Sequence, residues 1–441
     1  MRSIVRKVRS RFASLSPAEL FRYGCSSVVI LGVKFGVTAL VSRVISPYWA
    51  YLAAQVATFC VSYAIHSTWS FRVRPSWPAF RRYAAVVLSL KGIDYLLFAV
   101  VFGLLGIDAL AAVAVATAGI ALLRFFLARS ALLGKGAEAP AVESPAPPPT
   151  GENLTLPDGR TIRAFSFGDP EGRPLLYCHG WPGSGLQAAL ADDAARRFGF
   201  RVLSPDRPGI GGSDFVPGRR IADWPATAAA VTGAFGWERF HLLAVSGGGP
   251  YALATAAAFP ERVRSVTICC GAARPDLILS TEYSYPVYRA LRVLHEKAPF
   301  LLHGGLQLTR AYFRVVPMSW AFLPFFPFIP PTDRKAVRPR RHRILLARSV
   351  AAAFRQPPLG VLHDATRFIE DWGVDLGRIA CPVVFHHGAE DRNIPLEAAR
   401  QTAAEVPGAE FHEVPGHGHY SLPLLYLETI IGGIPRDGSS V

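Results

Sequence analysis

Ser246 is the residue whose setting most clearly indicates chemistry. It lies in AVSGGGPYALA, between a short apolar run and an Ala-rich stretch that predicts a helix. A serine at a sharp strand-to-helix turn is exposed as a nucleophile, and such a turn needs small residues two positions before and after it. Ala244 and Gly248 meet that requirement. The amides that open the following helix would face a developing oxyanion.

An acid and a base follow Ser246 in the chain order that such a site requires. Asp391 lies in HHGAEDRNIP, after the apolar run CPVVF, and Glu390 beside it is the weaker candidate. Two histidines, His417 and His419, compete in EVPGHGHY. In such a triad the histidine removes the serine proton and the carboxylate holds the imidazole. This chemistry predicts cleavage of an ester-like or amide-like acyl bond, with no metal or organic cofactor.

The segments around these residues predict an α/β fold with a mostly parallel sheet. Short apolar runs alternate with helical patterns, and NLTLPDGRTIRAFSF predicts an opening hairpin with Asp158 and Gly159 at its turn. Six further candidate strands lie in PLLYCHG, RVLSPDRPG, FHLLAVSGG, VRSVTICCG, CPVVFHHG and EFHEVPG. Loops at the carboxyl ends of parallel strands build the site of an open α/β sheet, so we expect the polar residues there to meet.

Five motifs carry a family resemblance. HGWPGS, DRPGIGGSD, SGGGP, GAEDRNIP and GHGH resemble the α/β-hydrolase superfamily over residues 153–425, and most of all its capped HGxP esterases and proline iminopeptidase-like enzymes. The resemblance implies that the backbone N–H groups of Trp181 and Gly247 form the oxyanion hole. Resembling sequences end this strand with Gly-His, which fits Gly418-His419 better than Gly416-His417. The resemblance therefore favours His419 over His417 as the base. Epoxide hydrolases and haloalkane dehalogenases of this shape use an aspartate nucleophile, so Ser246 argues against both activities.

An insertion over about residues 272–372 stands where such hydrolases carry a helical cap. It holds the aromatic and proline-rich MSWAFLPFFPFIPP, which is too broken to cross a bilayer, and then DRKAVRPRRHR. One interpretation is an apolar cap lining followed by a solvated helix face. The other is a cap that rests on anionic lipid headgroups and admits a lipid-like substrate.

The N-terminal region predicts a four-helix transmembrane domain. The first 135 residues hold 16 Lys+Arg against 3 Asp+Glu, and most of this charge lies between apolar stretches. That placement indicates membrane topology rather than nucleic-acid binding, and the positive-inside rule puts both termini and the hydrolase domain in the cytoplasm. Four stretches have the roughly 20 residues that a membrane-crossing helix needs. They are Tyr23–Val44, Tyr48–Phe71, Tyr83–Ile107 and Ala109–Leu127.

FRYGCSS, FCVSYAIHSTWSFR and FRRY resemble GtrA-like membrane proteins over about residues 20–132. The resemblance implies a multi-pass domain of the cell inner membrane, associated with polyprenyl-phosphate-linked sugars. The chain then divides into a membrane domain (1–133), a Pro/Ala-rich linker (134–151) and a hydrolase domain (152–441). Two functions are predicted as alternatives. One is a membrane-tethered serine hydrolase for a small-molecule or lipid-like acyl substrate, and the other is a sugar-carrier module with an accessory hydrolase. The sequence defines neither the acyl group nor the oligomeric state.

Three charged residues lie deep within the predicted spans. Lys34 and Asp94 are each about 17 Å into a core of roughly 30 Å. Lys91 is one helical turn from Asp94 on the same face. An unpaired charge at that depth costs several kcal/mol, so we expect all three to face the bundle interior. The cluster is either a structural ion pair or a site of net charge +1 that holds a lipid-linked phosphate.

Overall fold

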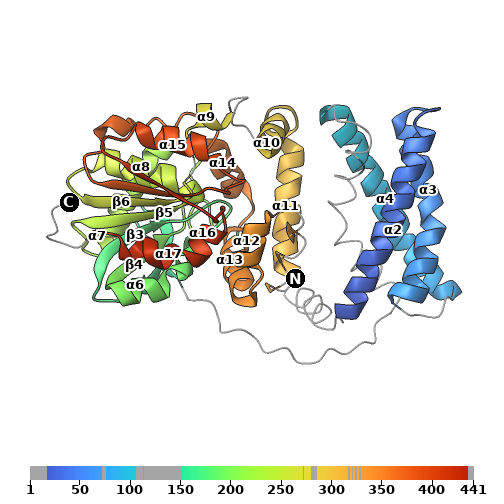
Figure 1. The fold of residues 1–441 in the computed structure, drawn as a ribbon, viewed down its shortest axis with the longest axis horizontal. Helices are drawn as coiled ribbons and strands as arrows, with labels where there is room; N and C mark the ends of the chain where they lie inside the picture. Colours follow the sequence, from blue (N-terminus) through green and yellow to red (C-terminus); the bar gives the residue numbers. More distant parts are fainter. Residues whose placement is uncertain are drawn as a thin grey trace. The chain divides into compact units, whose positions relative to one another are not determined.

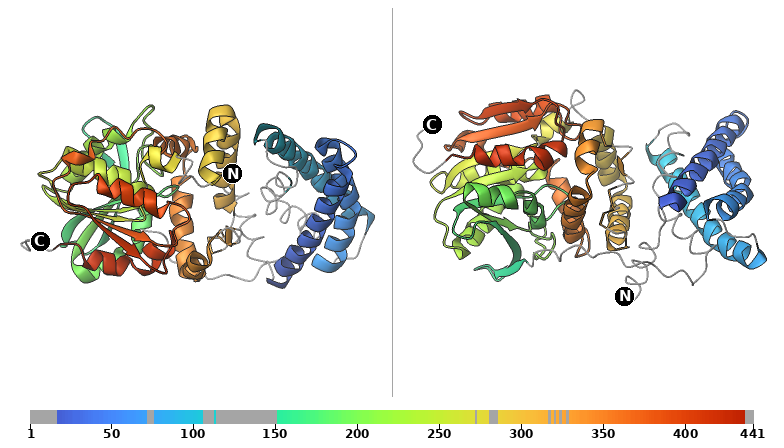
Figure 2. Two further views of the ribbon diagram at one scale, coloured as in Figure 1. Left: turned by 45° about the horizontal axis from the view of Figure 1, so that its top comes forward. Right: turned by 60° about the horizontal axis from the view of Figure 1, so that its bottom comes forward.

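In a computed structural model the chain divides into two compact units, Met1–Ser144 and Pro145–Val441 (Figures 1 and 2). The described residues are 17–71, 76–105, 113, 151–271, 273–279, 286–315, 318–319, 321–322, 325–326 and 329–435.

The first unit is mostly helical in its described part. It contains α2 (Pro17–Val41), α3 (Pro47–Ile65), the π-helical turn η1 (His66–Ser70) and α4 (Trp77–Leu105). Among these described helices, one stretch, Arg22–Val41, is long and apolar enough to cross a membrane by length and composition. The predicted fourth span lies outside the described residues, apart from position 113. The arrangement of four spans therefore stays a prediction.

The second unit is built on an eight-stranded sheet whose strand order is β1-β2-β4-β3-β5-β6-β7-β8. The hairpin strands β1 and β2 pair with each other in antiparallel fashion, as do β2 and β4, and the remaining pairs are parallel. Gly159 turns the hairpin with a φ of 83°. All six further predicted strands are present. The strands are β1 (Glu152–Thr155), β2 (Thr161–Gly168), β3 (Arg173–Cys178), β4 (Phe200–Pro205), β5 (Phe240–Val245), β6 (Val263–Cys269), β7 (Val383–Gly388) and β8 (Glu410–Val414).

Both faces of this sheet are covered by helices, as expected when successive side chains of a strand point to opposite faces. On β5, Leu242 and Ala244 pack under α7 (Trp224–Ala234) and α8 (Gly249–Ala258). Leu243 and Val245 belong to the opposite core, which also includes residues of three further helices. These helices are η2 (Gly185–Leu190), α6 (Asp192–Phe198) and α17 (Leu427–Gly432). Two more short helices, α15 (Leu396–Ala404) and α16 (Ser421–Leu425), flank β8 in the sequence.

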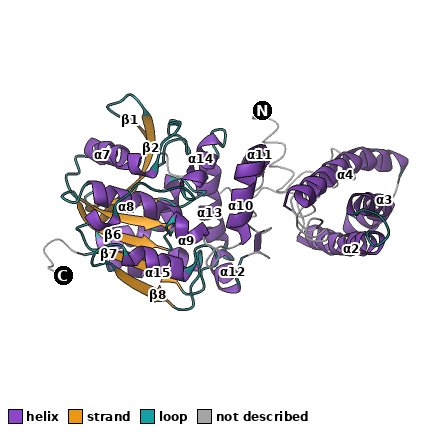
Figure 3. Ribbon diagram, turned by 90° about the horizontal axis from the view of Figure 1, so that it is seen from above, coloured by secondary structure: helices purple, strands orange, loops and turns teal. Residues whose placement is uncertain are grey.

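The segment between β6 and β7, which the sequence predicts to be a cap, is helical. Figure 3 shows α10 to α14 gathered beyond one end of the sheet. Within the aromatic segment, Phe322 and Ile329 are buried, while Phe325 is 45% exposed. Its backbone is held to α11 because the Tyr312 hydroxyl donates to the Ala321 carbonyl at 2.8 Å. The cap helices are α9 (Pro275–Leu279), α10 (Pro286–Lys297), α11 (Pro299–Val315), α12 (Pro331–Val337), α13 (Arg340–Ala353) and α14 (Leu359–Arg367).

Candidate active site

Ser246 lies on a sharp turn between β5 and α8, as its motif predicts. Its φ of 52° is in the left-handed region, which costs a non-glycine residue about 1–3 kcal/mol. A Cβ on Gly248 would stand 2.0 Å from the Cys178 carbonyl oxygen of β3, so only glycine fits there. Ala244, two residues before Ser246, is fully buried in the strand. The close packing of β3 and β5 therefore forces the turn that exposes Ser246.

His419 and Asp391 stand in line with Ser246. The His419 Nε2 atom is 3.0 Å from the Ser246 Oγ atom, and its Nδ1 atom is 2.8 Å from the Asp391 Oδ2 atom. Asp391 follows β7, and its other oxygen accepts the backbone N–H groups of Asn393 (2.7 Å) and Ile394 (2.8 Å). The turn after β7 thus fixes the Asp391 carboxylate, and this carboxylate orients the His419 imidazole.

His419 and Asp391 shift each other's pKa. Burial acts to raise the pKa of Asp391, but the charge and hydrogen bond of His419 outweigh it, and the pKa lies below its ordinary value. Burial lowers the pKa of His419, yet the nearby Asp391 charge and hydrogen bond, with a further contribution from Asp333, raise it above its ordinary value. The Nδ1 atom of His419 therefore faces a carboxylate, and its Nε2 atom faces the Ser246 hydroxyl.

The competing candidates are placed elsewhere. Glu390 is exposed, and its carboxylate accepts a hydrogen bond from the Thr332 hydroxyl. The His417 ring lies against Tyr426, with the ring centroids 5.6 Å apart. Neither side chain takes part in the hydrogen bonds that join Ser246, His419 and Asp391.

Asp333 is a site residue that sequence reasoning missed. It lies on cap helix α12, is almost fully buried, and accepts the backbone N–H groups of Tyr420 (3.0 Å) and Ser421 (2.8 Å). These are the two residues after His419. A cap carboxylate therefore anchors the loop that carries the imidazole. Asp333 lies within a basic run of the sequence, and nothing in the pattern connects it to residues 87 and 88 positions away.

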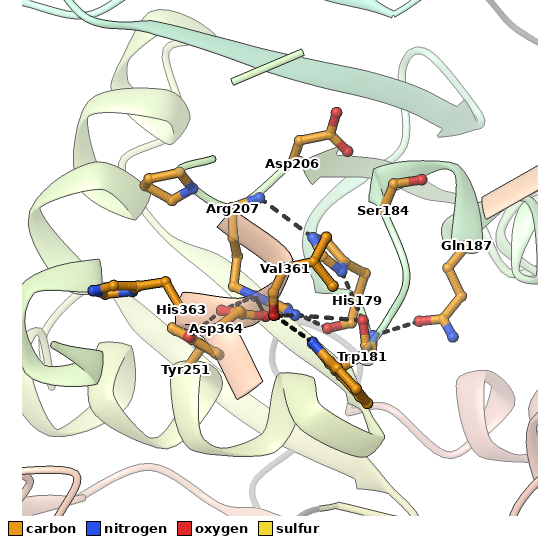
Figure 4. A network of polar contacts seen from close by, with 12 residues as sticks. His179, Trp181, Ser184, Gln187, Asp206, Arg207, Tyr251, Val361, His363 and Asp364 are labelled. Carbon is orange, nitrogen blue, oxygen red and sulfur yellow. Dashed lines mark hydrogen bonds and ion pairs between the residues drawn. The ribbon is translucent and has the colours of Figure 1, made fainter. Parts of the chain in front are cut away.

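Trp181 and Gly247, the expected oxyanion-hole residues, lie beside Ser246. A Cβ on Gly247 would be 3.3 Å from the Trp181 Cβ atom, and a Cβ on Gly180 would be 3.2 Å from the Ser246 Cβ atom. The loop after β3 therefore approaches the turn after β5. The indole Nε1–H of Trp181 donates to the Val361 carbonyl of α14 at 2.9 Å, which connects this loop to the cap (Figure 4).

A buried ion network lies behind that loop, and sequence reasoning missed it as well. Asp364 of α14 accepts hydrogen bonds from Arg207 (2.7 Å from Nη2), Arg219 (2.7 Å) and the Tyr251 hydroxyl (2.6 Å). Asp364 is fully buried and Arg207 is 1% exposed. Burial would raise the pKa of Asp364, but the two guanidinium groups hold it well below its ordinary value. Arg207 belongs to the motif DRPGIGGSD, whose glycine pattern indicates a turn and gives no sign of a buried ion pair.

The carboxylate of Asp206, which precedes Arg207 in the sequence, connects two loops of the site. It accepts the backbone N–H groups of Gly185 (2.7 Å) and Gly212 (3.1 Å), and burial raises its pKa to about 6. A Cβ on Gly211 would stand 1.9 Å from this carboxylate, and Gly211 has a φ of 58°. Glycine at this position lets the loop after β4 wrap around the carboxylate.

Three potential metal ligands meet at the site, namely Cys270, Asp391 and His419, whose ligand atoms lie within 4.8 Å of one another. Both ring nitrogens of His419 already face Ser246 and Asp391. Burial raises the pKa of the Cys270 thiol well above its ordinary value, which keeps it protonated and a poor ligand. The arrangement therefore fits proton transfer better than metal binding.

The predicted intramembrane residues also come together, within the first unit. Lys34 forms an ion pair with Asp94, and both side chains are almost fully buried. Gln55, which the sequence analysis did not single out, donates to Asp94 and accepts from Lys91 at 3.0 Å. Lys91 also donates to the Thr58 hydroxyl at 2.9 Å. The side-chain amide of Gln55 therefore bridges Lys91 and Asp94.

Comparisons with known proteins identify both units. A family model described as "alpha/beta hydrolase fold" matches residues 173–424, which is more than half of the chain. A second model, described as the transmembrane domain of GtrA/DPMS, matches residues 22–132.

Individual relatives resemble the second unit. The non-heme chloroperoxidase of Streptomyces lividans is 29% identical over 262 residues, covering 57% of this chain and 87% of the relative. The 2-hydroxymuconate semialdehyde hydrolase of Pseudomonas putida is 27% identical over 259 residues, covering 57% and 82%. The solved structure of an esterase from Thermogutta terrifontis is 22% identical, with a TM-score of 0.46, covering 64% of this chain and 95% of that chain.

The two histidines of GHGH form a matched pair for testing the geometry. His419→Ala removes the ring beside Ser246 and should slow the reaction of Ser246 with a fluorophosphonate probe by a factor on the order of 1000. His417→Ala removes the ring beside Tyr426 and should leave that rate within about threefold, since it leaves the residues that activate the serine in place. Labelling rates followed by intact-protein mass spectrometry measure both. The reverse ranking would show that His417 is the base.

Proposed function

Because the chain belongs to the α/β-hydrolase fold family, we propose that its residues 152–441 are a serine hydrolase that cleaves an ester-like acyl bond. The observation that carries the proposal is the hydrogen-bonded line from Ser246 through His419 to Asp391, with distances of 3.0 and 2.8 Å. An amide-like bond is the second substrate class, because the same groups serve both. The match of residues 22–132 to a transmembrane domain supports a membrane tether for this activity.

The proposed mechanism uses the chain's own residues at every step. His419 Nε2 takes the proton of Ser246 as its oxygen attacks the acyl carbon, and Asp391 stabilises the imidazolium that forms. The backbone N–H groups of Trp181 and Gly247 face the oxyanion, a contribution of roughly 3 kcal/mol per donor. His419 then gives the proton to the leaving group, and water, activated by the same imidazole, hydrolyses the acyl-enzyme.

Ester hydrolysis tests the proposal directly. Ser246→Ala should abolish turnover of a p-nitrophenyl ester, measured as release of nitrophenolate, while the thermal midpoint stays close to that of the unmodified chain. Turnover that survives in Ser246→Ala at the level of the unmodified chain would refute it.

The pH dependence of kcat/KM tests the role of the imidazole. His419 is the base only when neutral, and the Asp391 carboxylate raises its pKa above that of an ordinary histidine. The value of kcat/KM should therefore fall with decreasing pH, with a half-point above the pKa of about 6.5 of an unperturbed imidazole. Asp333→Asn removes one cause of the raised pKa and should move this half-point to lower pH. A profile that is flat between pH 5.5 and 8 would contradict the assignment of a histidine base.

The cap carries a basic surface that fits an anionic membrane. Residues 272–372 hold 15 Lys+Arg against 7 Asp+Glu, whereas residues 136–441 as a whole hold 31 against 29. The positive charge of the second unit is therefore concentrated on the cap. Five basic side chains of α12, α13 and their connection are exposed, namely Arg334, Lys335, Arg338, Arg340 and Arg341. Each basic residue near an anionic bilayer contributes about 1 kcal/mol.

Vesicle binding tests this surface on residues 145–441, a unit with its own two-sided core. Replacing Arg338, Arg340 and Arg341 with Gln should lower its partitioning onto phosphatidylserine vesicles about 100-fold, since three favourable charges of about 1 kcal/mol each are lost. Replacing the exposed Arg196, Arg197 and Arg220 with Gln removes as many charges away from the cap and should have a smaller effect. Equal binding to neutral vesicles, or salt-independent binding, would refute an electrostatic contact.

The second candidate function belongs to the membrane unit, where we propose a site for a lipid-linked phosphate. The specific observation is the cluster of the buried Lys34 and Asp94 with the half-buried Lys91, joined through Gln55. Its net charge of +1 suits an anion, and the match to a GtrA/DPMS transmembrane domain supports a carrier role. In this alternative the hydrolase domain is accessory. Both termini and the hydrolase domain face the cytoplasm in either proposal.

Asp94→Asn and Lys34→Met distinguish a phosphate site from a structural ion pair. Asp94→Asn should leave a folded protein that binds polyprenyl phosphate at least as tightly, because the removed charge repels phosphate. Lys34→Met should lose that binding at least tenfold. Binding to the detergent-solubilised full chain is measured by microscale thermophoresis. Loss of folded Asp94→Asn protein, or unchanged binding in Lys34→Met, identifies a structural pair instead.

A further inference from the structure

The Trp181 N–H group and the Gly180 carbonyl are two ends of one peptide. A peptide unit is planar and trans, so its N–H and C=O point in opposite directions. Whatever fixes the Gly180 carbonyl therefore also fixes the direction of the Trp181 N–H, one of the two donors of the proposed oxyanion hole. Gly180 itself does not restrict this direction, because glycine lacks the Cβ that limits φ and ψ.

Hydrogen bonds supply the restraint that glycine lacks. The Gly180 carbonyl accepts from the Gly183 N–H (3.0 Å), the His179 ring (2.9 Å) and Arg207 Nη2 (3.4 Å). The carbonyl of His179, one residue earlier, accepts from Arg207 Nη1. On the other side, the Gly180 N–H donates to Gln187 Oε1 at 2.6 Å. Both peptides that flank Gly180 are therefore held (Figure 4).

The protonation of His179 agrees with this arrangement. A carbonyl oxygen only accepts, so the hydrogen on the ring must sit on Nδ1, where it points to Gly180. The Nε2 atom then accepts from the Arg207 backbone N–H at 3.3 Å. Burial, followed by the charge of Arg207, lowers the pKa of His179 well below its ordinary value and keeps the ring neutral. Arg207 therefore forms hydrogen bonds with residues 179 and 180 through its backbone N–H as well as its side chain.

Arg207 is itself fixed by the cap. Its Nε atom lies 3.1 Å from Asp364 Oδ2 and its Nη2 atom lies 2.7 Å from the same oxygen. The guanidinium also packs over the Tyr251 ring, 4.6 Å from its centroid. A guanidinium holds several acceptors in one rigid plane, which an ammonium group cannot do. One buried cation therefore connects a cap carboxylate to two consecutive carbonyls of the loop beside Ser246.

We propose that Arg207 is a positioning residue that orients and polarises the Gly180–Trp181 peptide as an oxyanion donor, and that Asp364 makes this orientation depend on a seated cap. The inference rests on the proposed serine hydrolase function. A cation on the carbonyl end of a peptide draws electrons from its nitrogen, which makes the N–H a stronger donor. The interaction acts on the transition state, where the oxyanion carries charge, more than on the bound substrate.

Arg207→Lys tests the proposal in the full chain. The variant keeps a cation beside Asp364 but cannot hold both carbonyls in one plane. We expect kcat for a p-nitrophenyl ester, normalised to the sites that a fluorophosphonate titrates, to fall about 10- to 100-fold while KM changes less than threefold. The Ki of a trifluoromethyl ketone, which forms a tetrahedral oxyanion on serine, should rise by the same factor as kcat/KM falls.

Arg219→Lys is the matched control. Arg219 is also buried and bonded to Asp364, but its other hydrogen bonds go to the Tyr251 hydroxyl and the Pro208 carbonyl instead of the 179–180 segment. Both variants should lower the thermal midpoint, because both disturb a buried ion network. Only Arg207→Lys should change kcat and the ketone Ki by more than about twofold. Equal changes in the two variants would reduce Arg207 to a structural role and overturn the proposal.

Gln187→Met provides a second test should Arg207→Lys fail to fold. Gln187 is half-buried and holds the N–H side of Gly180, so its loss should lower kcat and raise the ketone Ki together, about three- to tenfold. An unchanged Ki in every folded variant overturns the proposal. If Ser246→Ala were as active as the unmodified chain, the proposed function itself would fail, which is a different and recognisable outcome.

Discussion

The site of this protein depends on backbone segments that approach each other more closely than any side chain would permit. Ser246 is held in a left-handed turn because Gly248 packs directly on the Cys178 carbonyl of the neighbouring strand. A Cβ on Gly388 would stand 2.4 Å from the His417 carbonyl, and one on Gly418 would stand 2.7 Å from the Asp333 carboxylate. These contacts bring the ends of β3, β5, β7 and β8 to one point. The distances between the proposed catalytic groups follow from this packing.

Two buried carboxylates at the site, Asp364 and Asp391, each have several hydrogen-bonding partners. Asp364 has two guanidinium partners and a tyrosine hydroxyl, and Asp391 has an imidazole and two backbone N–H groups. Removing one member of such a set leaves an uncompensated buried charge, which typically costs 3–5 kcal/mol. The same rule governs the first unit, where Lys34 is paired with Asp94. Pairing keeps these side chains in one conformation, and the proposed oxyanion donor depends on that rigidity.

The sequence was informative wherever function depends on local backbone geometry. A serine flanked by small residues, glycines at strand ends and the alternation of strand and helix patterns predicted the sheet, the turn at Ser246 and the meeting of Asp391 with His419. The sequence was uninformative where a contact joins distant segments without a periodic pattern. Arg207 and Asp364 are 157 positions apart, and each alone is an ordinary charged residue in a loop or a helix. Gln55 was missed for the same reason, since its role depends on a partner in another helix.

The cap contacts two of the loops that form the site. Through Asp333 it anchors the loop that carries His419. Through the Val361 carbonyl it contacts Trp181 directly, and through Asp364 it holds Arg207, which binds the same loop. The loop of the proposed base and the loop of one proposed oxyanion donor therefore each contact a different cap helix, α12 and α14. Displacement of the cap would disturb proton transfer and oxyanion binding together. A surface that attracts the basic side of α12 and α13 to a membrane would act on one of the same helices that position the proposed catalytic groups, which gives membrane contact a direct physical route to the site.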